Sequence, residues 1–174
     1  MAPLHDPVVP DEVELRASQR AEEDLGQGGS RTNYEDVDAR SWGEVKTAIE
    51  LLDGAHYSEL GISRGPTGSP GDSQREDTED LILGGGEDGR VSVLHVAVAP
   101  EGIVSYMAVE PERGDAIETR TIGGQGNDHP ARRWVSKDAA VRAVRHFVER
   151  GGRAPDVAWE FDFLDRREGP ADAE

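Results

Sequence analysis

Apolar residues recur along the chain with two different periods, and the change of period separates expected helices from expected strands. Between residues 41 and 54 an apolar residue occurs every three or four positions, at Trp42, Val45, Ile49 and Leu52. This spacing predicts an amphipathic helix. Ser41 stands before the first apolar residue and Glu44 follows three positions later, which is the pattern of a capping box, and Gly54 is expected to end the helix.

A second amphipathic helix is predicted over residues 136–151. Ser136 is a suitable N-cap, Asp138 favours the positive N-terminal end, and Gly151 closes the segment. Its expected buried stripe consists of Ala140, Val144, Phe147 and Val148.

From Leu81 to Ile122 the period changes to two. The segments LIL, VSVLHVAV, IVSYMAV and AIETRTI are separated by the turn-rich insertions GGGEDG, APEG and EPERGD. This alternation predicts a four-stranded antiparallel meander, with VSVLHVAV as a central strand because it is apolar on both faces. Further strands are expected at YSELGI, from Tyr57, and VAWEFDF, from Val157. The predicted fold class is therefore α+β: an antiparallel β-meander sheet with two helices packed on it and flexible acidic termini.

The two ends of the chain contain few apolar residues. Residues 1–40 combine three prolines with the polar run GQGGSRTNYEDVD, which predicts a mostly flexible acidic N-terminal segment. Within it, DEVELRASQRAEEDL is interpreted as a short polar helix over residues 11–25. The α+β domain is expected to span residues 41–163, and residues 164–174 are expected to form a flexible tail.

Charge and composition narrow the possible functions. Asp and Glu number 36 against 19 Lys and Arg, a net charge of -17 on 174 residues. The chain contains no cysteine, which excludes disulfides, thiolate metal sites and a cysteine nucleophile. No apolar run approaches the roughly 20 residues needed to span a bilayer. These features are typical of an acidic cytoplasmic protein that binds a basic partner.

Candidate catalytic chemistry is sparse. The five histidines are scattered without metal-ligand spacing, at His5, His56, His95, His129 and His146. No HxE with PCxxC occurs, so the zinc-deaminase arrangement is absent. We predict no catalytic residue, no metal site and no cofactor. His95, in the middle of a strand, is interpreted as a satisfied core residue. The alternative is an enzyme or small-ligand domain with an unrecognised pocket around His95, Tyr106 and Glu118.

Several positions together resemble a known family. They are Trp42 with Leu51 and Leu52, the glycine turn at 84–86, the Gly123–Gly124 pair, Val144 with Phe147, Gly151 with Gly152, and Trp159. Over residues 41–162 the pattern resembles the first numbered family of bacterial polymorphic-toxin immunity proteins, often paired with actinobacterial deaminase toxins. The resemblance implies a cytoplasmic antitoxin that binds one cognate toxin and blocks its active site without catalysis of its own.

The expected partner is thus a protein toxin with a basic cleft, a nucleic-acid deaminase, bound in a 1:1 heterodimer, with neither nucleic acid nor membrane as a ligand. Three acidic surfaces are candidates for binding it. They are Glu76, Asp77, Glu79 and Asp80 before the meander, Glu87 and Asp88 in its first turn, and Glu160 and Asp162 beside Trp159. The alternative for each is a solvated loop.

Two ambiguities remain at the sequence level. Strand alternation places Trp159, Phe161 and Phe163 on one face, where they either complete the core or anchor a partner. Basic residues crowd the second helix region, at Arg132, Arg133, Lys137, Arg142, Arg145, Arg150 and Arg153. Internal pairing or a solvated helix face explains them better than nucleic-acid binding, given the net charge. A general nucleic-acid mimic that inhibits many basic proteins is a further alternative function.

Overall fold

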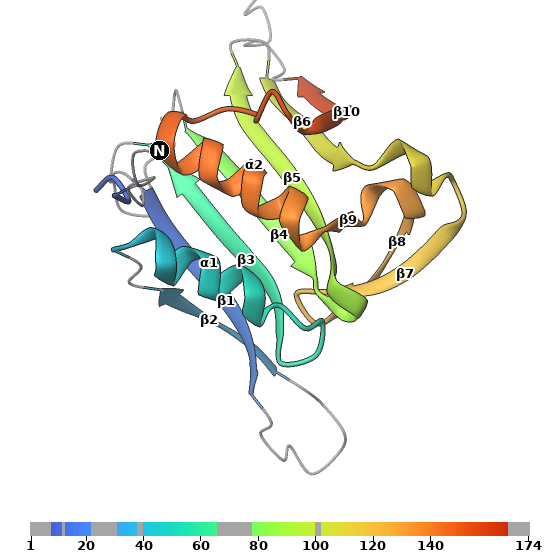
Figure 1. Cartoon of the computed structure of the whole chain (residues 1–174), viewed down its shortest axis with the longest axis horizontal. Helices are drawn as coiled ribbons and strands as arrows, with labels where there is room; N and C mark the ends of the chain where they lie inside the picture. The colour runs from blue at the N-terminus through green and yellow to red at the C-terminus, as the bar shows by residue number, and fades with distance from the viewer. Residues whose placement is uncertain are drawn as a thin grey trace, which may run out of the picture.

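A long antiparallel sheet with both helices on one face dominates the molecule (Figure 1). The computed structural model describes residues 8–11, 13–21, 31–37, 40–65, 78–99 and 102–166. The strands of the sheet are β1 Val13–Ala21, β2 Arg31–Val37, β3 Tyr57–Arg64, β4 Glu79–Gly85, β5 Arg90–Ala99, β6 Gly102–Val109, β9 Val135–Ser136 and β10 Ala158–Arg166. Their order is β10-β6-β5-β4-β3-β1-β2, and β9 pairs with β5.

Both predicted helices are confirmed, with the predicted N-caps and with Gly151 ending the second helix. The first helix ends at Leu51 with Leu52 as its C-cap, two residues before the predicted Gly54. Helix α1 spans Trp42–Leu51, and its capping box is complete: the Glu44 N–H donates to Ser41 Oγ at 3.3 Å and the Ser41 N–H donates to Glu44 Oε2 at 2.9 Å. Helix α2 spans Lys137–Arg150 and begins at the N-cap Ser136. The signals that define these ends are local in sequence, which is why the pattern was sufficient to place them.

The core lies between the helices and the face of the sheet that they cover. Helix α1 contributes its predicted stripe, and α2 buries the predicted residues together with Ala139 and Ala143. The sheet packs buried aliphatic residues against the helices, and these occur at alternate positions of its strands: Leu60, Ile62, Leu81, Leu83, Val91 and Val93. Each large side chain buried in this way contributes about 1.5–3 kcal/mol. The α+β fold class is confirmed.

The helix expected over residues 11–25 is wrong. Val13–Ala21 forms strand β1, which pairs with β3 on one side and β2 on the other. Val13 and Leu15 are buried and alternate with exposed Glu14, a period of two that the polar composition obscured. The sheet therefore extends N-terminal of residue 41. The expected flexibility of residues 1–7 and 22–30, and of the tail beyond Arg166, falls outside the described residues.

The last strand of the predicted meander lies elsewhere. AIETRTI forms β7 (Ile117–Ile122), which pairs with the unpredicted β8 (Gln125–Pro130) in a separate two-stranded sheet, while β10 takes the place beside β6. Short 3-10 turns redirect the chain, at η1 Glu87–Gly89, η2 Pro111–Arg113 and η3 Ala131–Arg133. Trp134, fully buried, fastens this hairpin by donating its indole N–H to the Glu118 carbonyl at 3.2 Å.

Candidate functional site

The predicted acidic residues of β10 are occupied by arginines within the fold. Arg132 Nε lies 2.8 Å from Glu160 Oε2, and an Arg133 guanidinium nitrogen lies 2.5 Å from Glu160 Oε1. Arg133 also contacts Asp162 Oδ1 at 2.9 Å. The hydrogen bonds from Arg132, followed by those from Arg133, lower the pKa of Glu160 to about 2. The arginines of η3 therefore already balance the charge of these two carboxylates in the free protein.

The aromatic residues of β10 do not share one face. Trp159 packs against the core and donates its indole N–H to the Ala154 carbonyl at 3.0 Å. Phe161 and Phe163, by contrast, are 53% and 45% exposed, so the expectation that they complete the core is wrong. A register shift between them pairs Phe161 with Tyr106 and Phe163 with the adjacent Ser105. This bulge sends the two rings to opposite faces of the sheet.

The acidic surface predicted before the meander is not assembled as one exposed cluster. Glu79 turns toward the end of α2, where its carboxylate accepts the Gly152 N–H at 2.7 Å and lies 3.9 Å from His95 Nε2. Asp80 is half-buried in β4. Glu76 and Asp77 lie outside the described residues. Glu79 therefore has a structural role at the end of α2.

The third predicted pair, Glu87 and Asp88, lies in η1 against the turn that follows α1. A Cβ built on Gly86 would lie 2.2 Å from the carbonyl carbon of Leu52, and Gly86 has a φ of +122°, so only glycine fits this close approach. The Glu87 side chain packs directly on Gly54. This contact brings the turn with Glu87 and Asp88 to the end of α1, where Glu50 and Asp53 stand near Lys137, and we call these four residues the acidic end.

Three of the four carboxylates of the acidic end are more exposed than those of β10, whereas Glu87 is half-buried against Gly54. Side-chain exposure is 59% for Glu50, 45% for Asp53 and 89% for Asp88, against 30% for Glu160 and 24% for Asp162. Cations border the cluster without covering it, at Lys46, Arg120 and Lys137. Arg120 is shared, because it bonds Glu118 at 3.0 Å and lies 3.6 Å from Asp88.

Asp53 also shapes the turn. Its Oδ1 accepts the backbone N–H groups of Ala55, His56 and Tyr57 at 2.8, 2.8 and 2.9 Å. Burial acts to raise the pKa of Asp53, but these hydrogen bonds outweigh it and lower the pKa. Sequence reasoning missed Glu50 and Asp53. The Asp-Gly pair at 53–54, typical of a turn, was the signal that could have identified Asp53.

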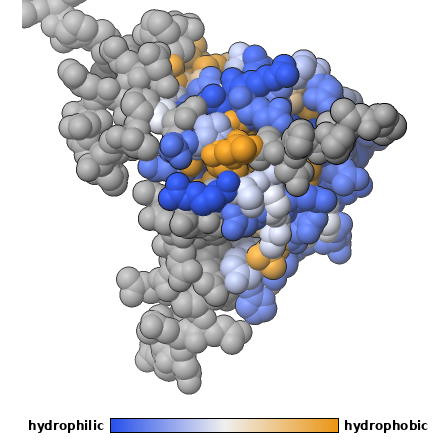
Figure 2. All heavy atoms as spheres, turned by 60° about the vertical axis from the view of Figure 1, so that its left-hand side comes forward, coloured by the Kyte–Doolittle hydropathy of each residue, from blue (hydrophilic) through white to orange (hydrophobic). Residues whose placement is uncertain are grey.

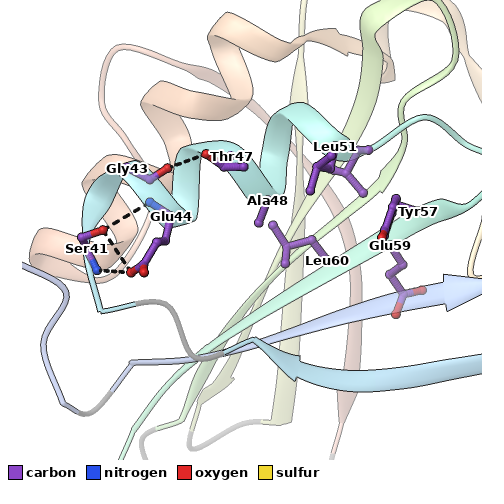
Figure 3. A pocket seen from close by; sticks show the side chains of 10 residues that line it. Ser41, Gly43, Glu44, Thr47, Ala48, Leu51, Tyr57, Glu59 and Leu60 are labelled. Atoms are coloured by element: carbon purple, nitrogen blue, oxygen red, sulfur yellow. Dashed lines mark hydrogen bonds between the residues drawn. The ribbon is translucent and has the colours of Figure 1, made fainter.

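A groove beside the acidic end runs between α1 and β3 and encloses about 400 Å³ (Figure 3). Its lining is mainly apolar side chains with acids at the margin: Ser41, Gly43, Glu44, Thr47, Ala48, Leu51, Leu52, Tyr57, Glu59 and Leu60. Leu51, outside the buried stripe of α1, is 50% exposed. Figure 2 shows the molecule from the side at the left of Figure 1, where small apolar patches interrupt a mostly hydrophilic surface.

The alternative pocket around His95 is not assembled. The His95 ring is 4% exposed and lies edge-on to Phe147 and Trp159. Burial lowers its pKa, which favours the neutral ring. Tyr106 pairs with His95 across the sheet, but the Glu118 carboxylate is held by Arg113 and Arg120 instead. The core position of His95 is confirmed. Its ring nitrogens, however, have no hydrogen-bond partner among the described residues, so it is not the satisfied residue that was expected.

The expected internal pairing of basic residues is confirmed for most of the region around α2. Besides Arg132 and Arg133, Arg145 pairs with Glu149 at 2.9 Å. Three further examples are Arg142 with Asp156, Lys137 with the carbonyls of Glu50 and Leu52, and Arg153 over the Tyr106 ring. Within the described ranges, no group of three or more His, Asp or Glu side chains has the arrangement of a metal site. In the same part of the chain, no helix combines the length and apolarity required to cross a bilayer.

Comparison with known proteins agrees with the resemblance carried by the sequence pattern. No curated protein and no solved structure matches the chain. The family model for immunity protein Imm1 matches residues 33–160, from β2 into β10. It thus covers both helices, the acidic end and the groove. The chain belongs to the Imm1 family of immunity proteins.

Proposed function

We propose that this immunity protein neutralises a secreted toxin that deaminates nucleic acid, by inserting its acidic end into the basic active-site cleft of the toxin in a 1:1 complex. The observation that carries the proposal is the difference in exposure between the acidic end and the arginine-paired acids of β10. Family membership supplies the antitoxin role. The site of action is the cytoplasm of the producing cell, where its nucleic acid lies.

The chemistry of the expected partner supports occlusion by charge. An enzyme that acts on DNA or RNA needs a positive cleft for phosphates. Carboxylates that enter such a cleft gain charge-assisted hydrogen bonds with its arginines and lysines. A net charge of -17 also speeds the encounter with a cationic partner. The protein thereby acts as an inhibitor that competes with the nucleic acid for the same cleft.

Among the predicted binding residues, Glu87 and Asp88 remain in the proposed interface, now joined by Glu50 and Asp53. Glu79, Trp159, Glu160 and Asp162 have partners within the fold. We therefore assign them a supporting role in shape and stability.

Inhibition by the purified protein tests the proposal. The toxin encoded by the neighbouring gene is assayed for deamination of single-stranded DNA and RNA while the immunity protein is titrated. We expect activity to disappear at one equivalent, and nucleic acid to compete with complex formation. An unrelated basic nuclease serves as the control and should retain full activity. Inhibition of both enzymes would favour the general nucleic-acid mimic, and a fully active toxin at excess immunity protein would refute the proposal.

A further inference from the structure

The groove between α1 and β3 is an apolar surface that continues directly into the acidic end. Leu51 and Leu52 line it at the point where α1 stops, and Tyr57, which also lines it, donates its backbone N–H to Asp53. We infer that this groove receives a short segment of the toxin in which an apolar side chain neighbours a lysine or arginine. The inference rests on the proposed function and assigns a second part of the interface.

The floor of the groove favours an apolar side chain. Ala48, Leu51 and Leu60 face this space together with the ring of Tyr57 (Figure 3). Leu51 is the informative residue, because it is half-exposed on a helix whose other large apolar side chains are buried. Burial of such a side chain by a partner is favourable, since apolar surface leaves water.

The polar side chains that α1 and its N-cap contribute to the lining are already engaged within the helix. Ser41 and Glu44 bond each other in the capping box, and Thr47 Oγ1 donates to the Gly43 carbonyl at 2.9 Å. A small polar ligand needs a few convergent polar groups that fix its orientation. The groove supplies apolar contact instead, so a protein segment suits it better.

The acidic residues beside the groove favour a lysine or arginine next to the apolar side chain of the toxin that enters it. Asp53 and Glu50 follow the groove at its Leu51 end, and Glu44 lines it at the other end of α1. Lys and Arg can lay their aliphatic stems on apolar surface while their charged heads reach a carboxylate. The same charges disfavour a second copy of this chain as the occupant, because two molecules of net charge -17 repel each other.

Two groove variants test the inference in the full-length protein. Leu51→Gln keeps a helix-forming residue of similar length but removes the apolar contact, and Thr47→Trp places a ring at the mouth of the groove. We expect each to weaken toxin binding about tenfold, mainly through faster dissociation. The matched control is Phe161→Gln, which removes an equally exposed apolar side chain from β10 and should leave Kd within about twofold.

The outcomes separate this inference from the proposed function. Unchanged Kd in both groove variants, while the wild-type protein still inhibits the toxin, overturns the inference alone. Loss of binding in Phe161→Gln instead assigns the contact to the edge of β10 and also overturns it. A melting temperature lowered by more than about 5 °C in Leu51→Gln would show that the chain itself covers Leu51. Wild-type dimers that dissociate in Leu51→Gln would show that a second copy does so.

Discussion

Two acidic regions of this protein contain the same chemical group in opposite states. At β10, Glu160 and Asp162 are held by Arg132 and Arg133 at 2.5–2.9 Å and are at most 30% exposed. At the acidic end, Asp88 is 89% exposed, and its nearest cation is shared with Glu118. The first region uses charge to hold β10 and η3 together, whereas the second leaves charge available to a partner. A count of acidic residues in the sequence does not distinguish these two uses.

The largest effect is expected from Arg133→Met. This change leaves Glu160 with one arginine and Asp162 with none of the ion pairs described here. We expect the free energy of unfolding to fall by about 2–3 kcal/mol, because removal of one partner leaves a partly buried charge uncompensated. Urea denaturation measures the loss. Arg145→Met is the control: it breaks a pair on the surface of α2 and should cost less than about 1 kcal/mol. Equal losses would erase the distinction between the two regions.

An intermediate effect is expected at the acidic end, on binding rather than on stability. The triple variant Glu50→Gln, Glu87→Gln, Asp88→Asn should associate with the toxin about tenfold more slowly at low salt. Its free energy of unfolding should stay within about 0.5 kcal/mol of wild type, because Glu50 and Asp88 are exposed and Glu87→Gln keeps the size of the half-buried side chain that packs on Gly54. Stopped-flow mixing gives the rate. The matched variant Glu112→Gln, Asp156→Asn, Asp165→Asn removes three charges elsewhere. If this control variant associates as slowly as the acidic-end variant, the net charge alone determines the association rate, and the position of the acidic end does not matter.

The smallest effect is the pH dependence contributed by Glu160. Its pKa is lowered to about 2 in the folded protein from an ordinary value of 4.5, so ionised Glu160 stabilises the fold above about pH 4.5. This contribution is lost as the pH falls from 4.5 through 2. Glu160→Gln retains an acceptor for the arginines, and we expect it to cost about 1 kcal/mol at neutral pH. Urea midpoints measured from pH 6 to pH 2 should decline less steeply in the variant. If the urea midpoint of Glu160→Gln falls with decreasing pH as steeply as that of wild type, the protonation of Glu160 is not coupled to folding.

The parts of the fold that the sequence predicted are those that local signals determine. Ser41 with Glu44, and Ser136 with Gly151, marked the helices because caps act within one turn. The pairing of β7 with β8 depends on η2 and on burial of Trp134, contacts between residues far apart in the chain. Strand β1 was mistaken for a helix because its polar residues hide a short alternation of Val13 and Leu15.

The candidate site was predicted in part, for a related reason. Glu87 and Asp88 were recognised as an acidic turn, but their proximity to Asp53 follows from the contact of Gly86 with Leu52, which no local pattern encodes. The arginine pairing of Glu160 also joins residues that are distant in sequence. Phe163 was misplaced because a bulge after Phe161 breaks the simple alternation that the prediction assumed.

The central claim is that exposed carboxylates of the acidic end enter a cationic cleft of the toxin. The most direct test is the association rate of wild type and the acidic-end triple variant, measured as ionic strength rises from about 0.02 to 0.5 M. We predict a steep fall for wild type, a much shallower fall for the triple variant, and convergence of the two rates at high salt. A wild-type rate that does not depend on salt, or equal slopes for the two proteins, would contradict the account.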